Sequence, residues 1–270
     1  MTFTHKHPVF LIHGMWSTGE TLKELEMAFQ EAGYETHAPS LPHHVSLGHM
    51  TEERKTALAN TGIQQYVSFL LTQVQTLKQP PIIIGHSMGG LLAQLLTQEM
   101  AKRGLPVHRV ILLSSAGPAG INGWYWSVVR TFGHNLFKLG LWQRCTNLRK
   151  SSVAYGIANT LDDATHTEIY NKRTLESGLA SWQIGMWFLY KNAPTFVDEN
   201  LVTCPMLILG GDEDRITPIQ VQHALSNKYT QAQLNAIEGA CHWTVAGKHL
   251  TQVCSHMFNW LDDQAASTAA

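Results

Sequence analysis

Blocks of hydrophobic and polar positions along this chain predict strands and helices in turn. Short, continuously apolar runs at residues 9–12, 81–84 and 206–209 are typical of strands buried on both faces of a sheet. Further strands are predicted at residues 34–38, 107–113 and 233–237. Residues 63–77 predict an amphipathic helix, because apolar side chains recur there every three or four positions. Helices are also expected at residues 21–32, 91–103, 218–228 and 245–262. This alternation predicts an α/β fold, with a mostly parallel central sheet and helices on both faces.

The strand rhythm stops after residue 116 and resumes near residue 206. The stretch between holds five of the chain's eight tryptophans and no convincing buried strand, and residues 124–140, 163–177 and 179–192 follow helical patterns. The simplest organisation is one core, residues 1–117 and 199–270, interrupted by a helical insertion at residues 118–198.

Composition narrows the class of protein. The 270 residues are 44% hydrophobic and 14% charged with a formal net charge of −1, which favours a globular domain and disfavours nucleic acid as a partner. No signal-like N-terminus and no run of 18 apolar residues is evident, so we expect a soluble, cytoplasmic protein without stable membrane insertion. The clustered His43, His44 and His49 lack a helical metal-binding spacing, so a solvated loop is expected there rather than a metal site.

One short motif carries the strongest chemical signal. Gly85, His86, Ser87, Met88 and Gly89 stand between an apolar strand and a helical stretch. Gly-x-Ser-x-Gly in that setting predicts a nucleophile elbow, in which the serine sits at the tip of a strained turn and the glycines leave room for it. The alternative is an ordinary glycine-rich turn with a capping serine, and the remaining chain must decide between the two.

A serine nucleophile needs a base and an acid that orients the base, in chain order serine, acid, histidine. Asp212 and Asp214 both follow the strand at residues 206–209, and His242 follows the last predicted strand. Asp214 is favoured because it begins an Asp-x-Ile-x-Pro pattern, which leaves Asp212 as a turn residue. His86 neighbours Ser87 but should point to the other side of the strand end, so it is read as a packed histidine.

Hydrolysis by this route also needs donors for the developing oxyanion. The Met88 amide would lie at the start of the elbow helix, where free N–H groups and the helix dipole favour negative charge. The second donor should come from the loop after the first strand, with the Met15 amide favoured because Gly14 lets the backbone approach closely.

With these elements the chain resembles the α/β-hydrolase superfamily over nearly its whole length. The residues that carry the resemblance are His13 to Trp16, Ala38 to Pro42, Gly85 to Gly90, Asp214 to Pro218, and His242 with Trp243. The resemblance implies a helical cap over the active site at residues 118–198. Ser40 replaces an aspartate common in relatives, and His43 and His44 replace a Gly-His-Gly stretch.

The predicted function is hydrolysis of a carboxylic ester or lactone with an apolar acyl part, including acyl lactone signals, through an acyl-enzyme. Substrate contacts are expected from five tryptophans, namely Trp16, Trp124, Trp126, Trp187 and Trp243. The open alternatives are a hydroxynitrile lyase, a carbon–carbon hydrolase, a thioesterase, an aminopeptidase and a non-catalytic receptor. No cofactor is required, and contiguous exposed aromatics on the insertion would favour a homodimer.

Overall fold

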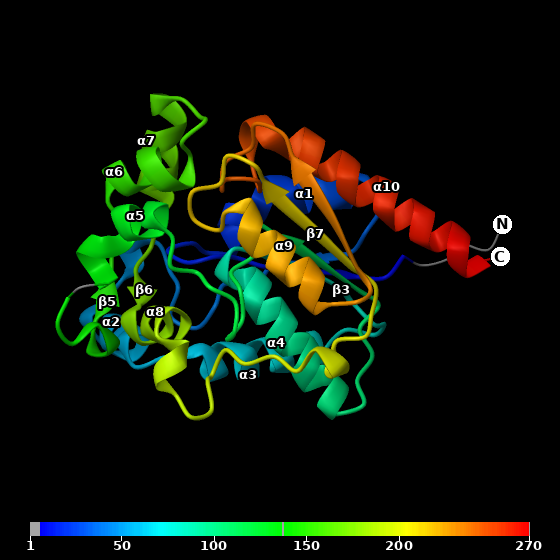
Figure 1. Ribbon diagram of the computed structural model, residues 1–270, viewed down its shortest axis with the longest axis horizontal. Helices are drawn as coiled ribbons and strands as arrows, with labels where there is room; N and C mark the ends of the chain where they lie inside the picture. The colour runs from blue at the N-terminus through cyan, green and yellow to red at the C-terminus, as the bar shows by residue number, and fades with distance from the viewer. Residues whose placement is uncertain (1–5, 137, 270) are drawn as a thin grey trace.

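Six parallel strands form the central sheet of the computed structural model, which describes residues 6–136 and 138–269 (Figure 1). Every neighbouring pair of strands in this sheet is parallel, which confirms the predicted fold class. In spatial order the strands are β2 (Thr36–His37), β1 (Val9–Ile12), β3 (Ile82–His86), β4 (Arg109–Leu113), β7 (Met206–Gly211) and β8 (Ala232–Ile237).

Helices cover both faces of the sheet because the strand side chains alternate between the faces. Val9 and Leu11 pack in the cluster that holds α1 and α10, whereas Phe10 and Ile12 pack in the cluster that holds α3, α4 and α9. Figure 1 shows α1 and α10 on one side of the sheet and α3 with α4 on the other. These helices are α1 (Lys23–Glu31), α3 (Ile63–Val74), α4 (Met88–Lys102), α9 (Ile219–Lys228) and α10 (Leu250–Ala269).

Some predicted boundaries differ from those of the structure. The expected helix at residues 21–32 begins as a 3₁₀ turn, Gly19–Leu22, before α1, and the strand expected at residues 34–38 is reduced to the two residues of β2. A second 3₁₀ turn, Leu47–His49, and helix α2 (Glu52–Ala59) connect β2 to α3.

The insertion gathers at one end of the molecule, with α2 beside it (Figure 1). Its elements are α5 (Trp126–Leu136), β5 (Cys145–Thr146), α6 (Lys150–Ser152), the π turn Val153–Ile157, α7 (Asp163–Lys172), β6 (Glu176–Ser177) and α8 (Gly178–Gly185), with 3₁₀ turns at Leu141–Gln143 and Trp187–Leu189. The prediction of one helix over residues 163–177 is wrong at its end, because Arg173 leaves the helical conformation and β6 pairs antiparallel with β5.

The loops that carry the predicted site residues leave the carboxyl ends of β1, β3, β7 and β8. In a parallel sheet these ends lie at one edge, which is where such folds bind their ligands. A last 3₁₀ turn, Gly247–His249, follows the loop after β8 and leads into α10, and another, Glu199–Leu201, precedes β7. The topology therefore brings four loops, which are distant from one another in the sequence, to one edge of the sheet.

Candidate active site

The turn after β3 holds Ser87 in a backbone conformation that side chains rarely adopt. Its φ is 58° and its ψ −122°, and such conformations cost about 1–3 kcal/mol. The turn closes because the Ser87 carbonyl accepts from the amides of Gly90 (3.0 Å) and Ala116 (2.9 Å), while the Ser87 amide donates to Leu113 (3.0 Å). The rest of the fold therefore holds the hydroxyl at the strand tip.

Gly85 is required by close packing, and replacing it by alanine should destabilise the protein. A Cβ at Gly85 would lie 2.1 Å from the Gly89 carbonyl oxygen, which belongs to the backbone and cannot rotate away. We expect Gly85→Ala to lower the free energy of unfolding by about 3 kcal/mol, measured by urea denaturation. Gly48→Ala is the matched control, since a Cβ there meets nothing within 4 Å; equal stability of the two variants would contradict the expectation.

Ser87, His242 and Asp214 form one hydrogen-bonded line. His242 Nε2 lies 2.9 Å from Ser87 Oγ, and His242 Nδ1 lies 2.8 Å from Asp214 Oδ2. All three side chains come from loops at the carboxyl edge of the sheet, and His242 and Asp214 are buried. The order matches a nucleophile, a base and an orienting acid.

The Asp214 carboxylate is held by four hydrogen bonds. Oδ1 accepts from the amides of Ile216 (2.7 Å) and Thr217 (2.9 Å), and Oδ2 accepts from the Thr217 hydroxyl (2.9 Å) as well as from His242. Burial alone would raise the pKa of Asp214, but the neighbouring His242 and these hydrogen bonds bring it below its ordinary value. Asp214 therefore stays ionised. Asp212 is exposed and instead accepts from the Gly239 amide at 2.8 Å.

The loop after β1 passes directly beside Ser87. A Cβ at Gly14 would lie 2.9 Å from the Cβ of Ser87, so only glycine permits this approach. His13 donates from Nδ1 to the Gly14 carbonyl (2.8 Å) and accepts at Nε2 from the Leu41 amide (3.0 Å). Met15 follows in this loop, and Met88 begins α4, where backbone amides lack helical acceptors.

His13 and His86 are buried and neutral. His86 donates from Nε2 to the His242 carbonyl oxygen at 2.9 Å, so it packs beneath the turn and does not contact Ser87 Oγ. Desolvation, assisted by nearby histidines, lowers the pKa of both His13 and His86 to about 3. Each imidazole therefore keeps one N–H and one acceptor nitrogen in the folded protein.

These two histidines should make the fold sensitive to mild acid. Below their ordinary pKa of about 6.5 the unfolded chain binds protons that the folded protein does not, so stability falls as the pH falls. Between pH 6.5 and 5 these two histidines should together lower the free energy of unfolding by about 3 kcal/mol, measured by urea denaturation. His86→Gln, whose amide can still donate to His242, should remove about half of that decrease; an unchanged slope would count against the assignment.

Two cavities adjoin at Ser87. The larger, about 300 Å³, is lined by His242 and by three acidic and three basic side chains, among other residues. The smaller, about 130 Å³, has mainly apolar walls, including Ile121, Val128 and Ile184. We call them the polar cavity and the apolar cavity. The charged residues of the polar cavity are Glu20, Lys23, Glu24, Glu168, Lys172 and Arg173.

Four of the five tryptophans proposed as substrate contacts line these cavities. Trp16 lines both, Trp124 and Trp187 line the apolar cavity, and Trp243 lines the polar cavity. Trp126 is 76% exposed and belongs to neither wall. It stands at the start of α5 on the outward face, so the prediction that it contacts substrate is not retained.

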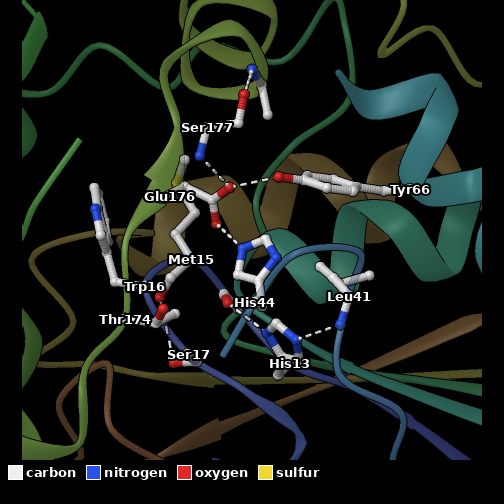
Figure 2. Close-up of polar contacts among 12 residues, drawn as sticks. His13, Met15, Trp16, Ser17, Leu41, His44, Tyr66, Thr174, Glu176 and Ser177 are labelled. Carbon is white, nitrogen blue, oxygen red and sulfur yellow. Dashed lines mark hydrogen bonds and ion pairs between the residues drawn. The ribbon is translucent and has the colours of Figure 1, made fainter. Parts of the chain in front are cut away.

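A second buried polar cluster was missed in the sequence. The Glu176 carboxylate lies 3.1 Å from His44 Nε2 and accepts from the Tyr66 hydroxyl at 2.8 Å (Figure 2). The prediction of a solvated histidine loop is wrong for His44, whose side chain is fully buried. A signal could have been the unusual histidine pair at residues 43 and 44, but its partner stands 132 positions away.

The described part of the chain holds neither a candidate metal site nor a candidate membrane span. No group of three or more His, Cys, Asp or Glu side chains is placed there to hold a metal ion. No helix among residues 6–136 and 138–269 is both long and apolar enough to cross a membrane.

Solved structures share this fold at low sequence identity. A methylesterase from Arabidopsis is 13% identical with a TM-score of 0.70, covering 95% of this chain and 99% of its own. An extracellular α/β-hydrolase from a Paenibacillus species is 17% identical with a TM-score of 0.67, over 94% and 98%. Polyneuridine aldehyde esterase is 12% identical with a TM-score of 0.68, over 94% and 99%. These likenesses show the fold alone.

Sequence comparison assigns the family. No curated protein sequence matches the chain significantly. The model of the alpha/beta hydrolase family matches residues 9–269, which include every strand of the central sheet and the loops that bear Ser87, Asp214 and His242. The chain therefore belongs to the alpha/beta hydrolase family.

Proposed function

We propose that this protein is a serine hydrolase that cleaves a carboxylic ester or lactone through an acyl-enzyme. The observation that carries the proposal is the hydrogen-bonded line from Asp214 through His242 to Ser87. A serine hydroxyl is a weak nucleophile until such a base removes its proton. Two of the structural neighbours are named esterases, which is compatible with this chemistry.

In the first step Ser87 Oγ attacks the carbonyl carbon while its proton passes to His242 Nε2. The ionised Asp214 holds the Nδ1–H and stabilises the imidazolium that forms. The amides of Met15 and Met88 donate to the oxyanion, and one such donor typically contributes about 10²–10³ in rate. When the carbonyl re-forms, the carbon–oxygen bond breaks and His242 gives its proton to the leaving oxygen.

In the second step water replaces the leaving alcohol. His242 takes a proton from this water, the hydroxide oxygen attacks the acyl carbon, and the tetrahedral intermediate collapses with return of the proton to Ser87 Oγ. The products are a carboxylic acid and the free enzyme. For a lactone the leaving oxygen stays attached to the acyl part, and the product is a hydroxy acid.

The two cavities suggest how an ester binds. His242 must reach the leaving oxygen, and it lines the polar cavity only, so the alcohol part is assigned to that cavity. The acyl part is then assigned to the apolar cavity, whose walls include Met88 and Trp124. We propose that the insertion, residues 118–198, acts as the cap that supplies most of this apolar wall.

The volume of the apolar cavity limits the acyl group. Its 130 Å³ is close to the roughly 150 Å³ of an engineered apolar cavity that holds benzene. An acyl chain of about four to six carbons, or one ring, fills such a space.

The aminopeptidase alternative needs an acidic side chain to hold the ammonium group of its substrate. Two candidates in the insertion already have partners, because Glu176 is buried against His44 and Glu168 pairs with Lys172 at 2.6 Å. These pairings disfavour that alternative.

A panel of p-nitrophenyl esters from acetate to dodecanoate tests the proposal. We expect kcat/KM to rise up to about four to six carbons and not beyond, because longer chains outgrow the apolar cavity. Ile184→Phe, which narrows that cavity, should shift the optimum toward acetate. The matched control is Ile169→Phe, since Ile169 lines only the polar cavity and its substitution should leave the acyl optimum unchanged.

The panel also separates the proposal from its rivals. Absence of hydrolysis across this ester panel and a matching series of acyl lactones, with the protein folded, would contradict a serine hydrolase of this type. An acyl optimum that moves with Ile169→Phe and not with Ile184→Phe would reverse the assignment of the two cavities.

A further inference from the structure

A carboxylate of the insertion is buried where the insertion meets the core. Glu176 in β6 is 0% exposed, and both of its oxygens are bound: Oε2 faces His44 Nε2 at 3.1 Å, while Oε1 accepts from Tyr66 (2.8 Å) and from the Ser177 amide (2.7 Å). Figure 2 shows the carboxylate between these groups. Removing one member of a buried ion pair is costly, because it leaves the other charge buried without compensation.

His44 is the partner that connects this carboxylate to the core loop. Its Nδ1 donates to the Pro42 carbonyl at 3.0 Å, which leaves Nε2 to face Glu176. Burial lowers the pKa of His44, but the charge of Glu176 and the hydrogen bonds outweigh burial and raise it. The pKa of Glu176 is lowered for the reciprocal reason, against the opposite effect of its burial. The two groups therefore form an ion pair.

From His44 a path of hydrogen bonds, connected through the covalent structure of His44 and Leu41, leads to the loop beside Ser87. The His44 amide donates to the Leu41 carbonyl at 3.0 Å, and the Leu41 amide donates to His13 Nε2 at 3.0 Å. His13 Nδ1 in turn donates to the Gly14 carbonyl at 2.8 Å. The rings of His13 and His44 lie 5.3 Å apart (Figure 2).

The end of this path is the peptide unit that supplies the Met15 amide. The Gly14 carbonyl and the Met15 N–H belong to one planar, trans unit, so fixing the oxygen fixes the direction of the N–H. A donor on the Gly14 oxygen also polarises the unit, which strengthens the opposite N–H as a donor. His13 thus sets both the direction and the strength of the Met15 amide.

The insertion holds the same loop at a second point. Trp16, the next residue, donates from Nε1 to the Thr146 hydroxyl at 3.1 Å, and its carbonyl accepts from the Thr174 amide at 2.9 Å. The Thr146 hydroxyl donates in turn to the Glu176 carbonyl at 3.3 Å. The path from Glu176 in β6 and the hydrogen bond from Trp16 to Thr146 in β5 therefore both connect the loop after β1 to the β5–β6 pair.

We propose that Glu176 and His44 are positioning residues that hold the Met15 amide in place for the oxyanion, acting through Leu41 and His13. The inference rests on the proposed serine hydrolase function. It assigns the insertion a role in the chemical step, in addition to its role as a wall of the apolar cavity.

The test measures the rate at which a fluorophosphonate probe labels Ser87, because this reaction uses the oxyanion donors and needs no knowledge of the substrate. We expect Glu176→Ala to slow labelling about 10- to 100-fold, since a misplacement of about 1 Å can cost 10²-fold. With p-nitrophenyl butyrate, kcat should fall in parallel while KM changes less than about threefold. Glu176→Gln, which keeps hydrogen bonding but not charge, should retain more of the rate than Glu176→Ala.

The matched control removes a different tie between insertion and core. Gln183 of α8 accepts from the Ile63 amide at 2.8 Å and lines neither cavity, so Gln183→Ala loosens the insertion without touching the path to Met15. The probe should label Ser87 of Gln183→Ala at a rate within about twofold of the native rate. All rates are taken well below the melting temperature of each variant. Should Glu176→Ala fail to fold, Glu176→Gln carries the test, with an expected slowing of about three- to tenfold.

Amide hydrogen exchange gives a readout independent of activity. Exchange in the peptide spanning residues 13–18 should be faster in the Glu176 variants than in the native protein, and unchanged in Gln183→Ala. Native labelling rates and native exchange in both Glu176 variants would overturn the inference, as would a rise in KM alone. If exchange is faster in the Glu176 variants but the native protein never reacts with the probe, the serine hydrolase proposal is contradicted instead.

Discussion

Ser87→Ala should lower kcat/KM for p-nitrophenyl butyrate by at least about 10⁴-fold, because it removes the proposed nucleophile. The hydroxyl that His242 Nε2 contacts at 2.9 Å is the only part removed. Covalent labelling by a fluorophosphonate should disappear at the same time. Activity is measured from p-nitrophenol release, and labelling by intact-protein mass.

The fold should survive this substitution. Alanine at position 87 keeps the φ of 58° that the turn imposes, and it removes no hydrogen bond from the backbone of the turn. The free energy of unfolding should therefore stay within about 1 kcal/mol of the native value. Hydrolysis above 1% of the native rate in a folded Ser87→Ala protein would mean that another nucleophile acts, and the proposed mechanism would be wrong.

Asp214→Asn should lower kcat by about 10⁴-fold with the fold intact. The amides of Ile216 and Thr217 both donate to Oδ1, so the asparagine oxygen must occupy that place and its NH₂ group must face His242. The NH₂ group donates to Nδ1 and drives the imidazole proton to Nε2, where it blocks acceptance of the Ser87 proton. The measurement is kcat across the ester panel.

Asp212→Asn is the control for this prediction. Asp212 is exposed and accepts one backbone hydrogen bond, from Gly239, which an asparagine oxygen can accept equally well. Its kcat should remain within about threefold of the native value. Comparable losses from the two substitutions would overturn the assignment of Asp214 as the acid.

The parts of the site that could be predicted from sequence are those fixed by local backbone. Ser87 follows a strand and precedes a helix, and Gly85 and Gly89 leave room for the turn. A segment of about ten residues therefore determines the geometry of the turn. Asp214 and His242 follow predicted strands, and parallel strands bring their carboxyl ends to one edge. The hydrophobic pattern predicts this topology, and the topology brings the three side chains into contact. The catalytic roles of Ser87, Asp214 and His242 stay a prediction.

What could not be predicted depends on contacts between distant segments. The helical pattern of residues 163–177 puts Glu176 at the end of a helix, but pairing with Thr146 and burial against His44 override that preference. The expectation that Trp126 contacts substrate rests on composition alone. Which face of α5 points inward depends on the packing of the insertion, and no local pattern contains that information.

The hydrogen bonds between β5–β6 and the loop after β1 affect how this scaffold can be re-engineered. Exchanging residues 118–198 for the corresponding segment of another α/β-hydrolase would leave His44 facing a foreign surface and would remove the acceptor of Trp16 Nε1. A graft that changes specificity should therefore carry residues 39–46 along with the insertion. The two segments form one transplantable unit, although 71 positions of the core lie between them.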